Sequence, residues 1–147
     1  MSASRVAALL AGLWAGIVLA VGLIGAPAGF AVLSTAAEAG RVAGRMFAVE
    51  APLSLALAVA IFLLERRRAR DRAEAGEGGS QFNGNMLLAL GALFCTVAGY
   101  YAIQPMMAAA RAGQGPWSFG ALHGASTLFF AVKGLLVLAL AWRLAPR

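Results

Sequence analysis

Two ionisable residues of opposite charge, Glu50 and Lys133, interrupt long apolar stretches of this sequence. An ionisable group inside a membrane-spanning helix costs roughly 2.5 to 3.5 kcal/mol on insertion scales, so it needs a partner or a water-filled cavity. Along ideal helices counted from Glu65 and Arg143, Glu50 lies about 22 Å and Lys133 about 15 Å from the same surface. The offset of about 7 Å is within reach of a lysine stem. We therefore expect an ion pair inside a helix bundle.

Three interpretations of this pair are open. It can be a structural ion pair that fixes helix packing, part of a proton or ion relay, or a lysine that extends toward lipid headgroups without a partner. If the pair forms, its remaining hydrogen bonds could be completed by Tyr100, Gln104, Ser126 or carbonyls freed by proline kinks. Trp14 is interpreted as a packing or lipid-contacting ring.

His123 lies about 30 Å from the same surface, near the opposite boundary. A lone histidine there is more typical of a hydrogen-bonded interfacial residue than of a ligand. A metal site needs several clustered donors, and the chain has one histidine, one cysteine (Cys95) and scattered methionines. Haem would need a second axial ligand from Met106, Met107 or another copy of the chain. Because phosphate-loop, zinc-protease and serine-hydrolase motifs do not occur, we predict no cofactor, no metal and no enzymatic activity.

Four apolar runs must position these residues. The 147 residues are 61% hydrophobic and 12% charged, whereas soluble domains carry about 25% charged residues. Each run is near the roughly 20 residues that a helix needs to cross a membrane. The runs cover residues 6–30, 43–64, 86–109 and 121–142, and the first is too long for a secretory signal, so it is interpreted as a retained span. The sequence predicts an all-α integral membrane protein, an antiparallel four-helix transmembrane bundle in a single domain over 1–147.

Small residues at four-residue spacing predict where helices pack. Membrane helices associate by close backbone approach, which glycine allows. The expected packing positions are Gly12, Gly16, Gly25, Gly29, Gly40, Gly44, Gly91, Gly99, Gly120 and Gly124. We expect such seams to hold the bundle together and to support association with another copy or with other membrane proteins.

The charged residues outside the runs predict orientation. The net charge is +6, and five of the twelve basic residues form one run: Arg66, Arg67, Arg68, Arg70 and Arg72. Beside a spanning helix such a run sets topology or meets anionic lipid, and nucleic acid is not expected as a partner. We expect residues 65–72 to extend the second helix into water until Gly76, Gly78 and Gly79 end it, and the 65–85 connection as a whole to form a flexible basic loop. Arg41 and Arg45 are expected at the opposite, outer interface. Eight arginines on the side of the termini against three opposite place both termini in the cytoplasm.

Four short segments, taken in order, resemble a known family. They are Leu13–Gly16 (LWAG), Ala26–Phe30 (APAGF), Ala39–Phe47 (AGRVAGRMF) and Leu122–Ser126 (LHGAS). With its four spans, the chain resembles the bacterial domain-of-unknown-function 4149 family, which is related to eukaryotic transmembrane protein 205. The resemblance implies a multi-pass membrane protein of unestablished activity. The family often has an asparagine after the histidine and serine of its fourth span, where this chain has Phe130.

Three functions follow in order of preference. The first is a structural or accessory protein of a bacterial inner membrane. The second is a small proton- or ion-coupled transporter or efflux component that uses Glu50, Lys133 and His123. The third is a haem- or metal-binding redox subunit. A transporter should have a polar cavity that reaches the Glu50–Lys133 pair, whereas a scaffold should have a dry, tightly packed core.

Overall fold

The computed structural model describes residues 2–146, and the regular structure in this range is helical throughout. The elements are α1 (Ala3–Leu19), a π-helical turn η1 (Ala20–Gly25), α2 (Ala26–Val32), α3 (Ala36–Glu74), α4 (Gly84–Thr96), a second π-helical turn η2 (Val97–Ala102), α5 (Ile103–Arg111) and α6 (Phe119–Leu144). Because α1, η1 and α2 are continuous, as are α4, η2 and α5, residues 2–146 form four helical rods long and apolar enough to cross a membrane. The prediction of an all-α protein with four membrane-length helices is confirmed.

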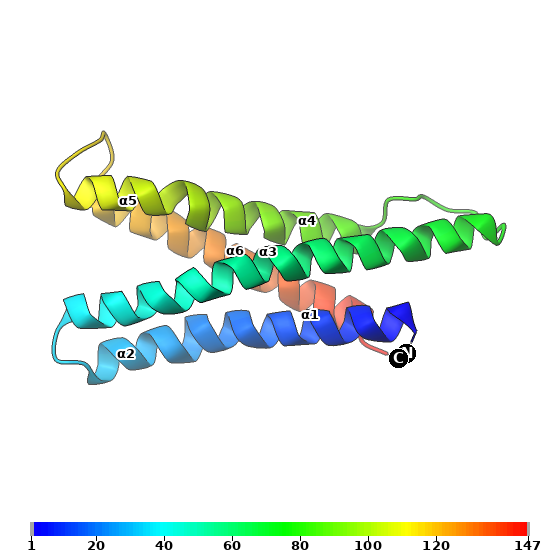
Figure 1. Ribbon diagram of the computed structural model, residues 1–147, viewed down its shortest axis with the longest axis horizontal. Helices are drawn as coiled ribbons and strands as arrows, with labels where there is room; N and C mark the ends of the chain where they lie inside the picture. The colour runs from blue at the N-terminus through cyan, green and yellow to red at the C-terminus, as the bar shows by residue number, and fades with distance from the viewer. Residues whose placement is uncertain (1, 147) are drawn as a thin grey trace.

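The rods form two hairpins that lie side by side (Figure 1). The first hairpin contains α1 to α3, and the second contains α4 to α6. Both chain termini and the 75–83 connection lie at one end of the bundle, which we call the terminal end; the connections 33–35 and 112–118 lie at the other, the distal end. The hairpins contact each other through α4 with α3 and through α1 with α6. Toward the distal end they diverge, as Figure 1 shows.

Alanine dominates the interior where the hairpins meet. Residues at most 1% exposed include Ala7, Ala11, Ala58, Ala89 and Ala92, with Trp14, Ile61, Val137 and Leu140 filling the space between them. Large apolar side chains such as Leu23, Leu128 and Trp142 instead face outward. Small residues inside and large apolar residues outside suit a lipid environment. There, close backbone contact stabilises helix packing, and an exposed leucine carries no penalty.

Three of the ten expected glycine positions lie against another helix. A methyl group added to Gly25, Gly91 or Gly99 would meet Met46, Leu136 or Phe129 respectively. The other seven, Gly12, Gly16, Gly29, Gly40, Gly44, Gly120 and Gly124, have no atom of another helix within 4 Å of such a methyl group. For these seven, the expectation of glycine seams within the chain is wrong. Alanines make the close inner contacts instead, while Gly40 and Gly44 border open space between the hairpins and Gly12 and Gly16 are exposed on α1.

The helix α3 continues beyond the expected end of the second span. It runs to Glu74, so residues 65–74 of the expected 65–85 loop are helical and the connection covers 75–83. Arginine and alanine are good helix formers, which favours this extension. The helix ends before Gly76, whose φ of 75° is readily adopted by glycine. Asn83 then caps α4, because its Oδ1 accepts hydrogen bonds from the backbone N–H groups of Asn85 and Met86.

Each π-helical turn lies shortly before a proline, η1 before Pro27 and η2 before Pro105. A proline removes one backbone donor from the helical ladder, and a wider turn is one way to re-space the remaining hydrogen bonds. Each turn also brings a glycine, Gly22 or Gly99, against one of two adjacent phenylalanines on α6. The last helix therefore passes close to the backbone of both rods at this level.

Replacing Gly99 tests this close contact. Gly99→Ala should lower the stability by about 1 to 3 kcal/mol through overpacking, because the new Cβ would lie 2.5 Å from the Cβ of Phe129. Gly12→Ala is the matched control, since it meets nothing within 4 Å and alanine favours a helix over glycine. Thermal unfolding in mild detergent, followed by size-exclusion chromatography, measures both. Equal melting temperatures for the two variants would contradict the contact at Gly99.

Candidate functional site

The centre of the site is a buried ion pair between the two hairpins. Lys133 on α6 places its Nζ 2.8 Å from both carboxylate oxygens of Glu50 on α3. Each residue is 2% exposed, and 83 positions separate them in the sequence. The structure thus brings together the two intramembrane charges that the sequence singled out. The two-oxygen contact gives the ammonium a defined position on the carboxylate.

The carboxylate of Glu50 is also held from its own helix and from α1. The hydroxyl of Ser54 donates a hydrogen bond to Glu50 Oε1, and the indole Nε1 of Trp14 donates to Ser54 Oγ at 2.8 Å. On the other side, Lys133 Nζ lies 4.7 Å from the centroid of the Phe130 ring, a cation–π contact. Among residues 2–146, no buried side-chain nitrogen or oxygen lacks a hydrogen-bond partner. Each charged atom of the pair therefore has at least one hydrogen-bond partner from the protein.

These supporting groups differ from those expected. Ser126 donates to the backbone carbonyl of Gly99 at 2.8 Å and does not contact the pair. Tyr100 and Gln104 line the nearby cavity, and no hydrogen bond joins them to the pair within residues 2–146. Sequence reasoning missed Ser54 and Trp14, the two residues whose hydrogen bonds hold the carboxylate of Glu50. The available signal was the spacing of Ser54, four residues after Glu50 on one helical face.

Trp14 was expected to pack or to touch lipid, and the structure resolves that choice. Its ring is 0% exposed and lies in the core formed by the alanines. A buried indole N–H needs an acceptor, which the hydroxyl of Ser54 supplies. Trp14 therefore connects the first helix to the ion pair as well as filling the core.

A cavity of about 960 Å³ reaches from the ion pair to the distal end. Its lining includes Ala36 and Phe119, the first residues of α3 and α6, as well as Glu50 and Lys133. From Phe119 to Lys133, α6 rises about 21 Å. The cavity thus occupies the space where the hairpins diverge in Figure 1, and the ion pair lies at its floor.

The mouth of the cavity carries positive charge from both hairpins. Arg41 on α3 and Arg111 on α5 line it, and the Arg111 guanidinium lies 4.6 Å from the centroid of the Phe119 ring. His123 also lines the mouth and stacks on Phe119 with a centroid distance of 5.8 Å. In the part of the chain that the structure describes, the salt bridges are those of Glu50 and Glu65. Neither arginine of the mouth therefore forms a salt bridge with a carboxylate.

Arg45 is separated from this arrangement. It was expected to share the outer interface with Arg41, and it is exposed, but it does not line the large cavity. It borders a second, smaller cavity of about 290 Å³ with Ile17 and Val49. The two arginines of the AGRVAGR segment therefore face different surroundings.

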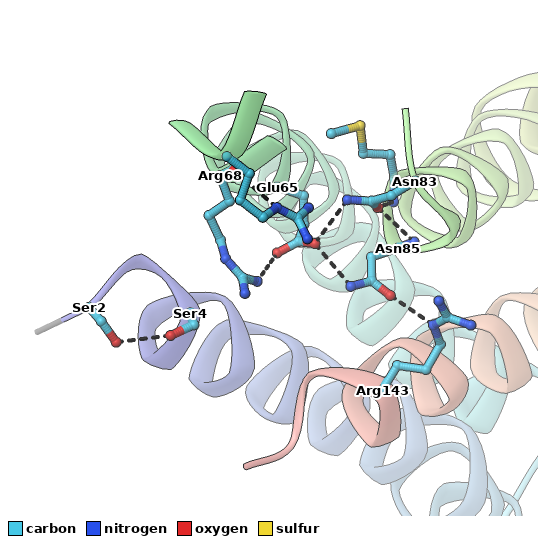
Figure 2. A network of polar contacts seen from close by, with 9 residues as sticks. Ser2, Ser4, Glu65, Arg68, Asn83, Asn85 and Arg143 are labelled. Atoms are coloured by element: carbon cyan, nitrogen blue, oxygen red, sulfur yellow. Dashed lines mark hydrogen bonds and ion pairs between the residues drawn. The ribbon is translucent and has the colours of Figure 1, made fainter. Parts of the chain in front are cut away.

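A second buried carboxylate, Glu65, closes the terminal end (Figure 2). Its Oε2 accepts hydrogen bonds from Nδ2 of Asn85 at 2.9 Å and of Asn83 at 3.4 Å, and its Oε1 is paired with Arg68. Arg143 on α6 donates from Nε to Asn85 Oδ1 at 2.8 Å. The network ties α3, α4 and α6 together. The sequence placed Glu65 in a solvated loop, but at 2% exposure it belongs to the interior.

The remaining donor residues do not gather. No group of three histidine, cysteine, aspartate or glutamate side chains lies together among residues 2–146. Cys95 is a buried free thiol that lines the large cavity, as does Met107, whereas Met106 is exposed.

Fold and site together define a class: a helical membrane protein in which two hairpins enclose a cavity with an intramembrane ion pair at its floor. A family model described as Domain of unknown function (DUF4149) matches residues 9–115, and the chain belongs to this family. The match includes Glu50 but ends before α6, which carries Lys133. No curated protein and no solved structure matches the chain.

Removing one charge of the ion pair should lower the stability of the protein more than removing both charges. Glu50→Gln or Lys133→Met alone leaves one buried charge, so each should lower stability by about 3 to 5 kcal/mol, whereas the charge-free double variant should lie near the wild type. Thermal unfolding in detergent measures all three, with Glu74→Gln at an exposed position of α3 as the control. Additive losses in the double variant would show that the two charges do not interact.

Proposed function

We propose that the protein is a small carrier that binds an amphipathic small molecule in its large cavity and uses Glu50–Lys133 as the gate at the floor. The observation that supports this most directly is the continuity of the cavity from the distal end to the ion pair. Cavities of roughly 300 to 1,000 Å³ are typical of small-molecule sites. A tightly packed scaffold has no need of such a space.

The difference between the two ends of the bundle supports a carrier. The distal end is hollow, whereas the terminal end is closed by the alanine core and by the network of Glu65, Asn85 and Arg143. A transporter that exposes its site to one side at a time needs an open end and a closed end in each state. In the proposed carrier, an open distal end and a closed terminal end would form one such state.

The ion pair supplies a means of coupling to protons. Protonation of Glu50 would remove the charge that Lys133 faces and leave a buried ammonium without a counter-ion. An uncompensated buried charge is strongly unfavourable, so the hairpins would be driven to rearrange or to admit water. The π-helical turns η1 and η2, next to Pro27 and Pro105, are places where such a rearrangement can be absorbed. The function requires no covalent chemistry.

The charge distribution supports an orientation in a bacterial cytoplasmic membrane with both termini inside. The terminal end carries the basic run on α3, where Arg66, Arg67, Arg70 and Arg72 are exposed and Arg68 is paired with Glu65. Cytoplasmic loops are rich in arginine and lysine, and exposed basic runs attract anionic lipid. The cavity mouth, with Arg41 and Arg111, would then face away from the cytoplasm.

A structural or accessory role is a second candidate, and one observation favours it. Gly12 and Gly16 form a G-x-x-x-G pair on α1 that is exposed, and a methyl group added at either position would meet nothing within 4 Å among residues 2–146. This spacing is typical of surfaces where membrane helices associate. A second copy of the chain or another membrane protein could occupy this face.

Thiol labelling distinguishes these functions. In a Cys95→Ser background, Thr127→Cys places a thiol in the cavity lining, and Leu128→Cys, at a position 65% exposed outside the lining, is the lipid-facing control. Native Cys95 reports from deeper in the cavity. A membrane-impermeant maleimide is applied to intact cells and to inside-out vesicles, and total thiol is counted after denaturation.

For a carrier, Cys95 should react from both sides because the floor is exposed alternately, and Leu128→Cys should react from neither. Reaction of Cys95 and of Thr127→Cys from the mouth side alone would show a fixed binding cup and contradict transport. Reaction of neither would show a dry core and favour the structural role.

A further inference from the structure

The charges and walls of the cavity also specify a class of ligand. We infer that the cavity takes a single-chain amphiphile with an anionic oxygen headgroup, bound by Arg41 and Arg111 at the mouth, with its apolar body directed toward the floor. This inference rests on the proposed function, because it names the ligand of the same cavity.

Both arginines offer donors to an anion at the mouth. They come from different hairpins, both line the cavity, and neither forms a salt bridge within residues 2–146. A guanidinium presents several N–H donors in a plane and binds carboxylate or phosphate oxygens well. The contact with Phe119 restricts the freedom of the Arg111 side chain, which lowers the entropic cost of binding.

The floor does not compete for the anionic headgroup. Lys133 already contacts both oxygens of Glu50, so the opposite charges of the pair are compensated within the floor. The charged lining residues outside this salt bridge are the two arginines at the mouth. A negatively charged group gains most by stopping there.

Between the mouth and the floor the walls favour an apolar body. The first hairpin contributes Phe30 and Phe47, and α6 contributes Phe130, whose ring packs edge-on against Phe47 at a centroid distance of 5.1 Å. The opposite wall adds Met107 together with the polar groups of Tyr100 and Gln104. A fully polar solute would leave the aromatic side chains without an apolar partner, and the arginines at the mouth would repel a cation.

Binding of a fluorescent C18 polyene carboxylic acid to the full chain tests the inference. The protein is placed in nanodiscs of zwitterionic lipid, and the acid is compared with its methyl ester and with the amine of the same chain. Empty nanodiscs are subtracted. The acid should bind at least about tenfold more tightly than the ester, and the amine should bind most weakly, because a tenfold change corresponds to one lost charge-assisted hydrogen bond.

Arginine variants locate the headgroup. Arg41→Gln and Arg111→Gln should each weaken binding of the acid by about tenfold and leave binding of the ester unchanged. Arg45→Gln is the matched control, because it removes the same charge one helical turn from Arg41 but outside the large cavity. Displacement of the probe by dodecanoate or by dodecyl phosphate identifies which anionic headgroup is preferred, and displacement by neither contradicts the inference.

The outcomes separate this inference from the proposed function. If acid and ester bound equally, or if Arg45→Gln weakened binding of the acid as much as Arg41→Gln and Arg111→Gln do, the inference of an anionic ligand would be overturned. The cavity would then be one that binds amphiphiles without regard to charge. Failure of all three probes to bind would overturn the binding cavity itself.

Discussion

The contact of one ammonium with both oxygens of one carboxylate sets the geometry between the two hairpins. In an apolar interior, Glu50 and Lys133 can each be accommodated only where the other lies, so the depth and rotation of α3 and α6 are fixed together. Ser54 and Trp14 extend this constraint to α1 through two further hydrogen bonds. Replacing such a pair by apolar residues of equal volume is often harmless to stability. The contribution of the pair here is therefore to fix how α3 and α6 are placed relative to each other.

A second buried carboxylate makes the bundle asymmetric along its long axis. Glu65 gathers Asn85 and, through it, Arg143 at the terminal end, where the hairpins are close. At the distal end the two arginines that line the cavity form no salt bridge, and the hairpins lie apart. Polar contacts that join the hairpins at one end only agree with a cavity that narrows toward the terminal end.

Much of the fold could be predicted because its determinants are local. Run length and composition determine the four helices, and two isolated charges in such runs indicated the pair. The partners of Glu65 could not be predicted, because burial of one acid within a charged run depends on which helix covers it. The glycine positions failed for a related reason. Spacing shows that two residues share a face of a helix, but it does not show which face contacts a neighbouring helix. In this protein alanines form most of the contacting faces.

The separation of Glu50 and Lys133 by 83 residues has a consequence for how the chain is made. The second span enters the bilayer while the fourth has yet to be synthesised, so the carboxylate of Glu50 must stay inside the membrane without its counter-ion until then. Each unpaired charge costs roughly 2.5 to 3.5 kcal/mol on insertion scales. Insertion of α6 removes this cost because Lys133 then pairs with Glu50. Insertion of the last helix is therefore the step that fixes the arrangement of the first three. A chain truncated before Lys133 would expose an unpaired acid in the membrane to the cell's quality control.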